Sequence, residues 1–530
     1  MAPDGALYLG LDSSTQSLSA VVLEASGGRH RVVYELSLPF DDTLPHYGTR
    51  NGVLPSSDPS IAHSSPVMWA EALDRLFVRL GEARLDLTRL TAISGSAQQH
   101  GSVYLNDTFA RGLDTLHPGR ALPPQIVPLL SRPIAPIWMD SSPHAECREI
   151  ENAVGGAAAL AQHTGSRAFE RFTGPQIRRF ATREPAAYAA TDRIHLVSSF
   201  LASVLMGGDA PVDPGDGSGM NLLDLATLDW WTPAVDATAP ALRRRLPALA
   251  PSSAIAGRLA PYWRRRYQLP GAKVVVWSGD NPCSLIGLGL VREGQRAVSL
   301  GTSDTIFGPM RTPRVDAGGT GHVFGAPTGE FMGITVFSNG SLARERIRDQ
   351  YGLTWEGFSH ALDTTPPGNG GALMLPWFVP EITPVVAEPG VHRLDLDERD
   401  AAANVRAVVE AQMTALALHS RWMEVTVDTI HVTGGAAANR QILQVLADVF
   451  GAAVHRREVS NAAALGAALR ALHADRVDDR APITWDELVA GLDQQVPDVI
   501  HPISGHHERY LAQRARYARF EQTEYARARA

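Results

Sequence analysis

Two short polar turns, each between two strand-like runs, constrain this chain more than any other feature. The first turn is Asp12-Ser13-Ser14-Thr15, within the segment Leu7 to Glu24. The second is Gly301-Thr302-Ser303-Asp304, within Ala297 to Gly308. Small hydroxylated turns can direct backbone N–H groups and hydroxyls at a phosphate, and a leading carboxylate can face a divalent ion. Ordinary turn chemistry explains either turn alone, but the pair indicates two similar lobes facing one nucleotide.

A third segment has a related pattern near the end of the chain. Thr429 to Thr433 predicts a strand, Gly434 to Asn439 a glycine-rich connection, and Arg440 to Phe450 a helix. Glycines between a strand end and a helix start let a flat ring or a phosphate approach bare backbone. Such a connection is common in α/β proteins, so it indicates a nucleotide-binding site only in combination with the two turns.

The length of 530 residues exceeds what one hydrophobic core usually holds. We therefore expect two domains, residues 1–265 and 266–530, divided where prolines interrupt the chain before the strand Val274 to Trp277. Val- and Ile-rich strands alternate with Ala- and Leu-rich helical patterns, which predicts an α/β fold. Two Pro-, Gly- and Ser-rich stretches, 39–66 and 107–136, are expected to be functional or mobile loops.

Composition argues against several classes of protein. The net charge of −8 disfavours a nucleic-acid-binding surface, and we interpret the basic runs Arg243–Arg245 and Arg264–Arg266 as solvated helix faces. Two cysteines, Cys147 and Cys283, are too few for a disulfide framework. The chain shows no signal peptide and no bilayer-spanning apolar run, so a cytoplasmic location without membrane contact is expected.

A carboxylate follows the strand that begins at Val274. In Ser278-Gly279-Asp280-Asn281-Pro282, we expect Asn281 to be the N-cap and Pro282 to open a helix. Asp280 then lies at a strand's carboxyl end, where open α/β sheets bind ligands. It either helps to cap the helix or accepts a proton from a hydroxyl nucleophile, as a catalytic Asp does in phosphoryl transfer.

Two polar clusters in the first half have the donors and acceptors that a polyhydroxyl ligand needs. One contains Gln98, Gln99 and His100, and the other contains Trp138 and Asp140. Paired donors and acceptors discriminate between sugars because an unpaired buried group is costly. Internally satisfied loops are the alternative. His100 lacks a helical His or Glu partner, so the spacing does not favour zinc.

These segments occur in one order along nearly the whole chain. They are DSSTQS at 12–17, SGSAQQHGS at 94–102, WMDSS at 138–142, TGSRAFERFTG at 164–174, DGSGMNLLD at 216–224, SGDNP at 278–282, SLGTSDT at 299–305, NGS at 339–341 and TGGAAANRQILQVLADVF at 433–450. In these motifs the chain resembles the FGGY family of carbohydrate kinases, and within it the eukaryote-type xylulose kinases. Ser141-Ser142 after Asp140, where many family members place an arginine, is similar to that subgroup.

The resemblance implies a two-lobed, actin-like ATPase (ribonuclease H-like) fold with duplicated domains and a central cleft. Sugar binding and the first phosphate hairpin would belong to the N-terminal domain, and ATP binding and the catalytic Asp to the C-terminal one. The implied activity is ATP-dependent phosphorylation of D-xylulose to D-xylulose 5-phosphate, with ATP and Mg²⁺ as cofactors. A homodimer is left open.

The resemblance also implies roles for individual residues. Asp280 would be the catalytic base, and Asp12 would address Mg²⁺, directly or through water. We expect Arg167 to lie one helical turn before Arg171, and only one of the two to face the sugar. Asp304 is expected to cap its turn, with metal contact as the alternative. The implied sugar-binding residues are His100, Arg171, Asp280, Asn281, Gln99 and Asp140. The implied nucleotide-binding residues are Asp12, Ser13, Ser14, Thr15, Gly301, Thr302, Ser303, Trp355, Gly434, Gly435, Ala436 and Asn439.

Two other functions remain open from the sequence. One is a kinase of the same fold for another pentulose or polyol, such as ribulose, fuculose or glycerol. The other is a non-catalytic sugar-sensing regulator, which would be expected to have lost Asp12 or Asp280; both are present.

Overall fold

The computed structural model describes residues 5–457, 461–492 and 498–529. Contacts divide the chain into two compact units. The first contains Met1–Val291, Val323–Phe331 and Ser460–Gln494, and the second contains Arg292–His322, Met332–Val459 and Gln495–Ala530. Residues 266–291 thus group with the first unit by contacts, and the division of the sequence at 265/266 stays a prediction.

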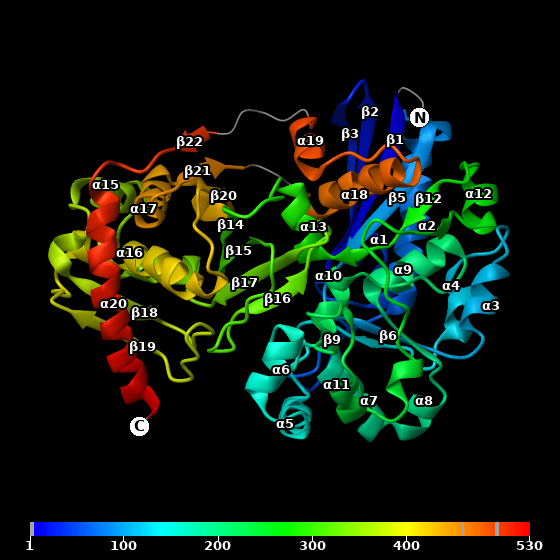
Figure 1. Cartoon of the computed structure of the whole chain (residues 1–530), viewed down its shortest axis with the longest axis horizontal. Helices are drawn as coiled ribbons and strands as arrows, with labels where there is room; N and C mark the ends of the chain where they lie inside the picture. The colour runs from blue at the N-terminus through cyan, green and yellow to red at the C-terminus, as the bar shows by residue number, and fades with distance from the viewer. Residues whose placement is uncertain (1–4, 458–460, 493–497, 530) are drawn as a thin grey trace. The chain divides into compact units, whose positions relative to one another are not determined.

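The first unit is built on a seven-stranded sheet with the order β11-β12-β5-β1-β2-β3, in which β13 also pairs with β5 (Figure 1). The strands are β1 (Ala6–Ser13), β2 (Ser17–Ser26), β3 (Arg29–Pro39), β5 (Leu90–Ala97), β11 (Ile255–Arg258), β12 (Lys273–Val275) and β13 (Ser278–Gly279). Strands β1 and β2 form the predicted hairpin, while β1, β12 and β13 run parallel to β5. The carboxyl ends of these parallel strands meet at one edge, where polar residues gather.

Helix α18 (Ala462–Asp478) covers β1 and β5 and explains why β1 contains a glycine. A Cβ added to Gly10 would lie 2.0 Å from the backbone oxygen of Ala464, so only glycine lets the helix approach the strand this closely. Other helices of the unit are α2 (Pro66–Glu82), which packs on β2, and α9 (Val197–Met206), which packs on β5. Covered in this way, β1 is an almost continuous apolar run.

A second seven-stranded sheet, ordered β16-β17-β15-β14-β20-β21-β22, repeats the central arrangement. Its strands belong to the second unit, except most of β16 and the first residue of β17. The strands are β14 (Gln295–Leu300), β15 (Asp304–Met310), β16 (His322–Gly325), β17 (Phe331–Phe337), β20 (Thr429–Thr433), β21 (Ala453–Arg456) and β22 (Asp498–Ile500). As in the first unit, an antiparallel hairpin (β14 and β15) pairs through its first strand with a later parallel strand, β20. This repetition agrees with the predicted duplication.

Helices α14 (Ser341–Gln350), α15 (Trp355–Thr364), α16 (Ala401–His419), α17 (Arg440–Phe450) and α20 (His506–Arg529) complete the second unit. Helix α16 contacts the other four, and α20 also packs on α17. The predicted strand Thr429–Thr433 and helix Arg440–Phe450 are confirmed residue for residue. Their ends are well marked because Asn439 caps the helix and Gly451 ends it with a positive φ of 67°.

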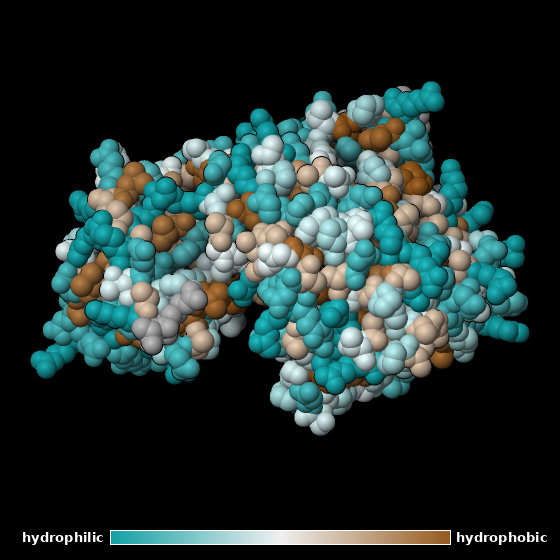
Figure 2. Space-filling view, turned by 60° about the horizontal axis from the view of Figure 1, so that its bottom comes forward, coloured by the Kyte–Doolittle hydropathy of each residue, from teal (hydrophilic) through white to brown (hydrophobic). Residues whose placement is uncertain are grey.

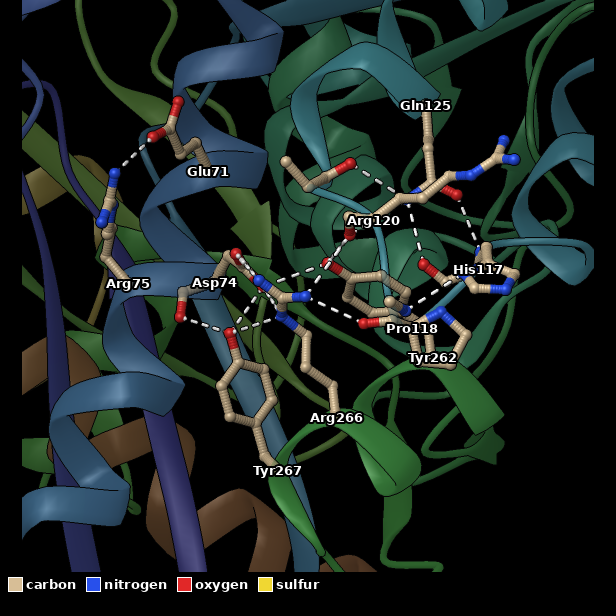
Figure 3. Close-up of polar contacts among 12 residues, drawn as sticks. Glu71, Asp74, Arg75, His117, Pro118, Arg120, Gln125, Tyr262, Arg266 and Tyr267 are labelled. Atoms are coloured by element: carbon tan, nitrogen blue, oxygen red, sulfur yellow. Dashed lines mark hydrogen bonds and ion pairs between the residues drawn. The ribbon is translucent and has the colours of Figure 1, made fainter.

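The stretch 107–136 contains α3 (Phe109–Asp114), α4 (Pro123–Ile126) and a 3-10 turn, and Arg266 fastens it to the core (Figure 3). Arg266, on α12 (Pro261–Tyr267), donates to the carbonyl oxygen of Pro118 at 2.8 Å and pairs with Asp74 of α2 at 3.1 Å. Tyr267 donates to the same carboxylate at 2.6 Å. The interpretation of Arg264–Arg266 as a solvated face is therefore wrong for Arg266, because the sequence pattern did not show its distant partner.

On the face shown in Figure 2, hydrophilic residues cover most of the surface and hydrophobic ones are scattered in small groups. Among the described residues, no helix is both long and apolar enough to cross a bilayer.

Candidate active site

The register of the first sheet places three polar residues side by side at the carboxyl ends of its strands. Asp12 of β1 is opposite Ser96 of β5, and Ser96 is opposite Ser278 of β13. Asp280 follows two residues after Ser278, so the two carboxylates that the sequence singles out lie at the same edge of the sheet. This is the position at which α/β sheets generally bind ligands.

Asp280 does not precede a helix capped by Asn281, as expected, but is itself the first residue of α13 (Asp280–Gly287). Gly279 is the N-cap and supplies no side chain, and a Cβ there would lie 2.4 Å from Cγ of Gln99. The Asp280 carboxylate accepts from the backbone N–H of Asn281 at 2.8 Å. The close approach of Gln99 therefore excludes a side-chain cap at position 279 and leaves Asp280 at the helix start.

Asn281 and Gln99 are joined directly, because Nδ2 of Asn281 donates to Oε1 of Gln99 at 2.8 Å. The same amide also lies 3.1 Å from Asp280. The Gln99 amide nitrogen in turn donates to the carbonyl oxygen of Gly215 at 3.3 Å. These bonds fix the orientation of both amides beside the Asp280 carboxylate, so three predicted sugar-binding residues are brought together.

Burial raises the pKa of both carboxylates. Desolvation raises the pKa of Asp280 to about 6, although hydrogen bonds from the backbone of Asn281 and Gln99 act to lower it. The pKa of Asp12 rises to about 7, chiefly by desolvation, with a smaller contribution from the charge of Asp280. A hydrogen bond of 2.6 Å from Ser96 to Asp12 acts in the opposite direction. Carboxylates poised in this way are typical of catalytic sites.

His100 is neutral and has a defined tautomer. Its Nδ1 lies 2.7 Å from the carbonyl oxygen of Gly219, so Nδ1 carries the proton and Nε2 is an acceptor. Desolvation first, and the charge of Arg171 second, lower its pKa to about 3. The backbone of His100 has a φ of 75°, and its ring packs edge-on against Phe172 at 4.7 Å. The side chain thus presents a fixed acceptor, which suits a hydroxyl.

Arg171 and Arg167 are not a helical turn apart, because both lie in the non-helical segment between α6 (Ala157–Thr164) and α7 (Thr173–Arg183). Both guanidinium groups lie 4.8 Å from the ring of Phe169. Arg171 is the one whose charge acts on His100, and desolvation lowers its pKa to about 10. The electrostatics therefore favour Arg171 as the cation of the His100 cluster.

The three hydroxyl groups in the turn of the first hairpin differ in their hydrogen bonding. Ser14 accepts from the backbone N–H of Ser17 at 3.2 Å and so closes the turn. Thr15 accepts from the indole N–H of Trp138 at 2.8 Å and lies 3.4 Å from Gln98. The hydroxyl of Ser13 is buried and has no hydrogen-bond partner among the described residues. Sequence reasoning missed the contact of Trp138 with Thr15, since no local pattern links residues so far apart.

Asp140 is fully buried and already well bonded. Its carboxylate accepts from the backbone N–H of Ala62 at 3.0 Å, from Gln176 at 2.9 Å and from Ser142 at 2.6 Å. His63 lies 3.4 Å away on the other side. These bonds hold the loop that carries Trp138. Contact of Asp140 with a sugar stays a prediction, and it would require exchange of one of these bonds.

The second unit contains an open pocket of about 990 Å³ beside the turn of its hairpin, at the upper end of the volumes typical of small-molecule sites. Six of the predicted nucleotide-binding residues line it: Gly301, Thr302, Trp355, Gly435, Ala436 and Asn439. Sequence reasoning missed Arg344, Glu345, Ser359, Arg440 and Gln441, which also line it. Ser303 and Gly434 are not among the lining residues of the pocket.

Gly434 and Asn439 nonetheless shape this pocket. Gly434 has a φ of 93°, and a Cβ there would lie 2.6 Å from the carbonyl oxygen of Leu300, so only glycine lets this segment pass the end of β14. Asn439 accepts from the backbone N–H of Gln441 at 3.1 Å and donates to Ser359 at 2.8 Å. Asn439 thus caps α17, and its contact with a nucleotide stays a prediction.

The Asp304 carboxylate is held by an arginine of α14 and does not cap its own turn. Its two oxygens accept from Arg344 at 2.9 and 3.0 Å, and both side chains are buried. Gln412 accepts from Arg344 at 2.8 Å and donates to the carbonyl oxygens of Asn339 and Gly340. The ion pair therefore holds Asp304 at the start of β15. The interpretation of Asp304 as a cap of its turn is wrong, because its partner lies 40 residues away, and contact with a metal ion stays an untested alternative.

Asp12 has the chemistry of a magnesium ligand. Ser96 occupies one of its oxygens, while the other makes no hydrogen bond among the described residues. Mg²⁺ is commonly held by one or two carboxylates, with waters and substrate phosphates completing its coordination. Within the described ranges, no group of three or more His, Cys, Asp or Glu could hold a metal ion. The single carboxylate of Asp12 fits a cation whose other ligands are water and phosphate oxygens.

The chain is similar to known carbohydrate kinases over most of its length. Models of the FGGY family of carbohydrate kinases match residues 131–287 (N-terminal domain) and 296–474 (C-terminal domain). The xylulose kinase of Rattus norvegicus is 40% identical over 534 residues, which covers 98% of this chain and 97% of that protein. Xylulose kinase 2 of Arabidopsis thaliana is 40% identical over 493 residues, covering 89% and 88%.

Solved structures confirm the predicted fold class. The xylulose kinase from Rhodospirillum rubrum has a TM-score of 0.81 at 18% identity, over 99% of this chain and 100% of that one. At this level of identity the likeness concerns the fold.

Proposed function

This chain belongs to the FGGY family of carbohydrate kinases, and we propose that it transfers the γ-phosphate of ATP to D-xylulose, giving D-xylulose 5-phosphate. The observation that carries the proposal is the cluster of Asp280, Asn281, Gln99 and His100 at the sheet edge that also holds Asp12. The xylulose kinases that are 40% identical over nearly the full length support the choice of sugar.

We infer that Asp280 is the general base. As the terminal hydroxyl oxygen of the ketose bonds to the γ-phosphorus, the bridging P–O bond breaks, ADP leaves, and the hydroxyl proton passes to the Asp280 carboxylate. A pKa of about 6 keeps this carboxylate ionised at neutral pH, and still within reach of a proton from the hydroxyl. The bonds from Asn281 hold this carboxylate in place. Because the hydroxyl oxygen attacks the γ-phosphorus directly, no covalent enzyme intermediate is needed.

The sugar would be held by groups of defined polarity. Nε2 of His100 would accept from one hydroxyl, because Gly219 fixes the proton on Nδ1. Arg171, Asn281 and Gln99 would supply donors, and Asn281 and Gln99 are oriented by their mutual bond. Asp140 acts as a positioning residue in this proposal, since its carboxylate bonds mainly to the loop around it.

ATP would occupy the pocket of the second unit. Trp355 is 43% exposed on α15 and offers an aromatic face for the adenine, while Gly301 and Thr302 would approach the phosphates, with Ser303 beside them. Gly434, Gly435, Ala436 and Asn439 would line the adenine and ribose. Asp12 would hold Mg²⁺, with Ser13, Ser14 and Thr15 near the transferred phosphate; when bound, the ion would neutralise charge on the phosphates.

The two buried, unpaired cysteines are compatible with a reducing compartment, and we propose a cytoplasmic location on that basis. A kinase for another pentulose or polyol remains the closest alternative, because few contacts separate such sugars.

The test is ADP release with Mg²⁺ and ATP across D-xylulose, L-xylulose, D- and L-ribulose, L-fuculose, glycerol and no sugar. We expect selective turnover of D-xylulose, which falls by about a hundredfold or more in Asp280→Asn, the scale of a lost general base. Asp114→Asn is the matched control, because Asp114 is exposed and is not one of the predicted site residues. Turnover of a different sugar would replace D-xylulose, and absence of turnover with intact ATP binding would favour a regulator.

A further inference from the structure

A second pocket in the first unit lies outside the predicted sugar and nucleotide residues. It has a volume of about 470 Å³ and lies between α7, the β4–β7 pair and the segment before α8 (Pro185–Ala189). Strands β4 (His63–Ser64) and β7 (Ala135–Pro136) pair antiparallel. Its lining is Ile61, His63, Arg132, Ile134, Ser142, Gln176, Arg179, Phe180, Arg183 and Glu184. We call it the arginine pocket.

The charge of the arginine pocket is positive. Arg132, Arg179 and Arg183 line it, against one carboxylate, Glu184. Arg132 pairs with Glu184 at 3.0 Å, and Arg179 lies 3.6 Å from Glu146. Arg183 is exposed and has no ion pair among the described residues. Arginine forks match the oxygens of phosphate, which makes an anion the natural occupant.

Arg132 shows that the pocket is more than a group of surface arginines. It is only 9% exposed, its Nε is buried without a hydrogen-bond partner among the described residues, and its guanidinium lies 4.9 Å from the ring of Phe180. A buried donor without a partner calls for an explanation in a native structure, and an absent water or ion is one of them.

The arginine pocket is connected to the first hairpin through Asp140. His63, Ser142 and Gln176 line the pocket and contact the Asp140 carboxylate. Asp140 holds the loop from which Trp138 donates to Thr15 at 2.8 Å. A ligand that moves the pocket side chains would therefore act on the hydroxyl of that turn.

We propose that the arginine pocket is a second ligand site, for a small phosphate-bearing anion, and that its occupancy is transmitted through Asp140 to the Trp138–Thr15 hydrogen bond. Binding of the anion does not depend on the proposed function. The volume of the pocket accommodates a compact phosphate monoester or inorganic phosphate.

Binding is tested by calorimetry on the full chain, with inorganic phosphate and with D-ribose 5-phosphate. A saturating non-hydrolysable ATP analogue and D-xylulose are present, so that phosphate sites at the proposed active site are occupied. We expect one anion per chain, and about tenfold or more weaker binding in Arg183→Glu. The matched control is Arg148→Glu on α5 (His144–Ala153), where an exposed arginine without a described ion pair undergoes the same charge reversal.

Tighter binding of D-ribose 5-phosphate would identify a monoester as the occupant, and equal or tighter binding of phosphate would identify the free ion; both support the site. No binding to the wild-type chain, or equal weakening in Arg183→Glu and Arg148→Glu, would overturn it. Transmission is read from tryptophan fluorescence. A phosphate-dependent change that persists in Trp138→Phe would refute the link to Thr15.

Discussion

Replacing Asp280 by asparagine should stabilise the ligand-free protein while it abolishes most activity. Burial raises the pKa of Asp280 from its ordinary 3.8 to about 6, which corresponds to about 3 kcal/mol of unfavourable ionisation free energy at neutral pH. This is an upper limit, because the residue keeps partial exposure. The amide retains an oxygen for the backbone N–H of Asn281, so we expect a net gain of about 1–2 kcal/mol, or a rise of roughly 1–3 °C in Tm for a unit of this size.

The gain has a defined pH dependence. The folded wild-type protein binds the Asp280 proton more tightly than the unfolded chain does, so this carboxyl destabilises the fold as pH rises through about 6. The penalty disappears below the unfolded pKa of about 4, and the amide does not titrate. The difference in Tm between variant and wild type should therefore be largest near pH 8 and shrink towards pH 4. Removal of the Asp280 charge also eases ionisation of Asp12, which adds to the gain at pH 8.

Thermal unfolding of both proteins without ligands, at pH 8, 6 and 4.5, measures this difference directly. Asp114→Asn is the control, and it should show no pH-dependent gain because Asp114 is exposed. If Asp280→Asn is no more stable than wild type at pH 8, the carboxylate is not desolvated. Burial would then not raise the pKa of Asp280, and the argument that this pKa suits a general base would be wrong.

Three further predictions concern turnover. The kcat/KM for the sugar should fall at acid pH with an apparent pKa near 6, to about a tenth of its plateau at pH 5, as Asp280 takes up a proton; a flat profile down to pH 5 would contradict this, and a limb that shifts with Mg²⁺ concentration would belong to Asp12. His100→Asn, which tolerates the positive φ, should lower kcat/KM for the sugar by about 10–100-fold without changing the KM for ATP, and an effect on ATP instead would remove His100 from the sugar site. Trp355→Ala should raise the KM for ATP about tenfold and Trp355→Phe much less, whereas an unchanged KM in both would place the adenine elsewhere.

Local patterns predicted the elements around the site well. The hairpins at Asp12 and Gly301, the strand Thr429–Thr433 and the helix Arg440–Phe450 all agree with the structure. Each depends on neighbours within a few residues, such as the cap at Asn439, which bonds to the second and third residues after it. Such signals are contained in the sequence itself.

The start of α13 was mispredicted for a physical reason that the sequence does not contain. Asn281 and Pro282 are good residues for an N-cap and a first turn, yet the helix begins one residue earlier, at Asp280. Gln99 packs so closely on Gly279 that the chain enters the helix through a glycine. Since Gln99 belongs to another strand end, only the fold determines which residue of this segment begins the helix.

Contacts with distant residues also determine which polar side chains bond within the protein and which can bind a ligand. Asp140 was expected to contact the sugar and Asp304 to cap its turn, but both carboxylates bond to distant partners, Gln176 and Arg344. His100 is also bonded, but only through Nδ1 to a carbonyl oxygen, which leaves Nε2 as a fixed acceptor. A motif therefore predicts where a polar side chain lies. Its partners from distant parts of the chain determine whether that side chain bonds within the fold or is free to bind a ligand. Variants at Asp140 are therefore expected to change the position of Trp138 and Thr15, whereas a direct contact of Asp140 with the sugar stays a prediction.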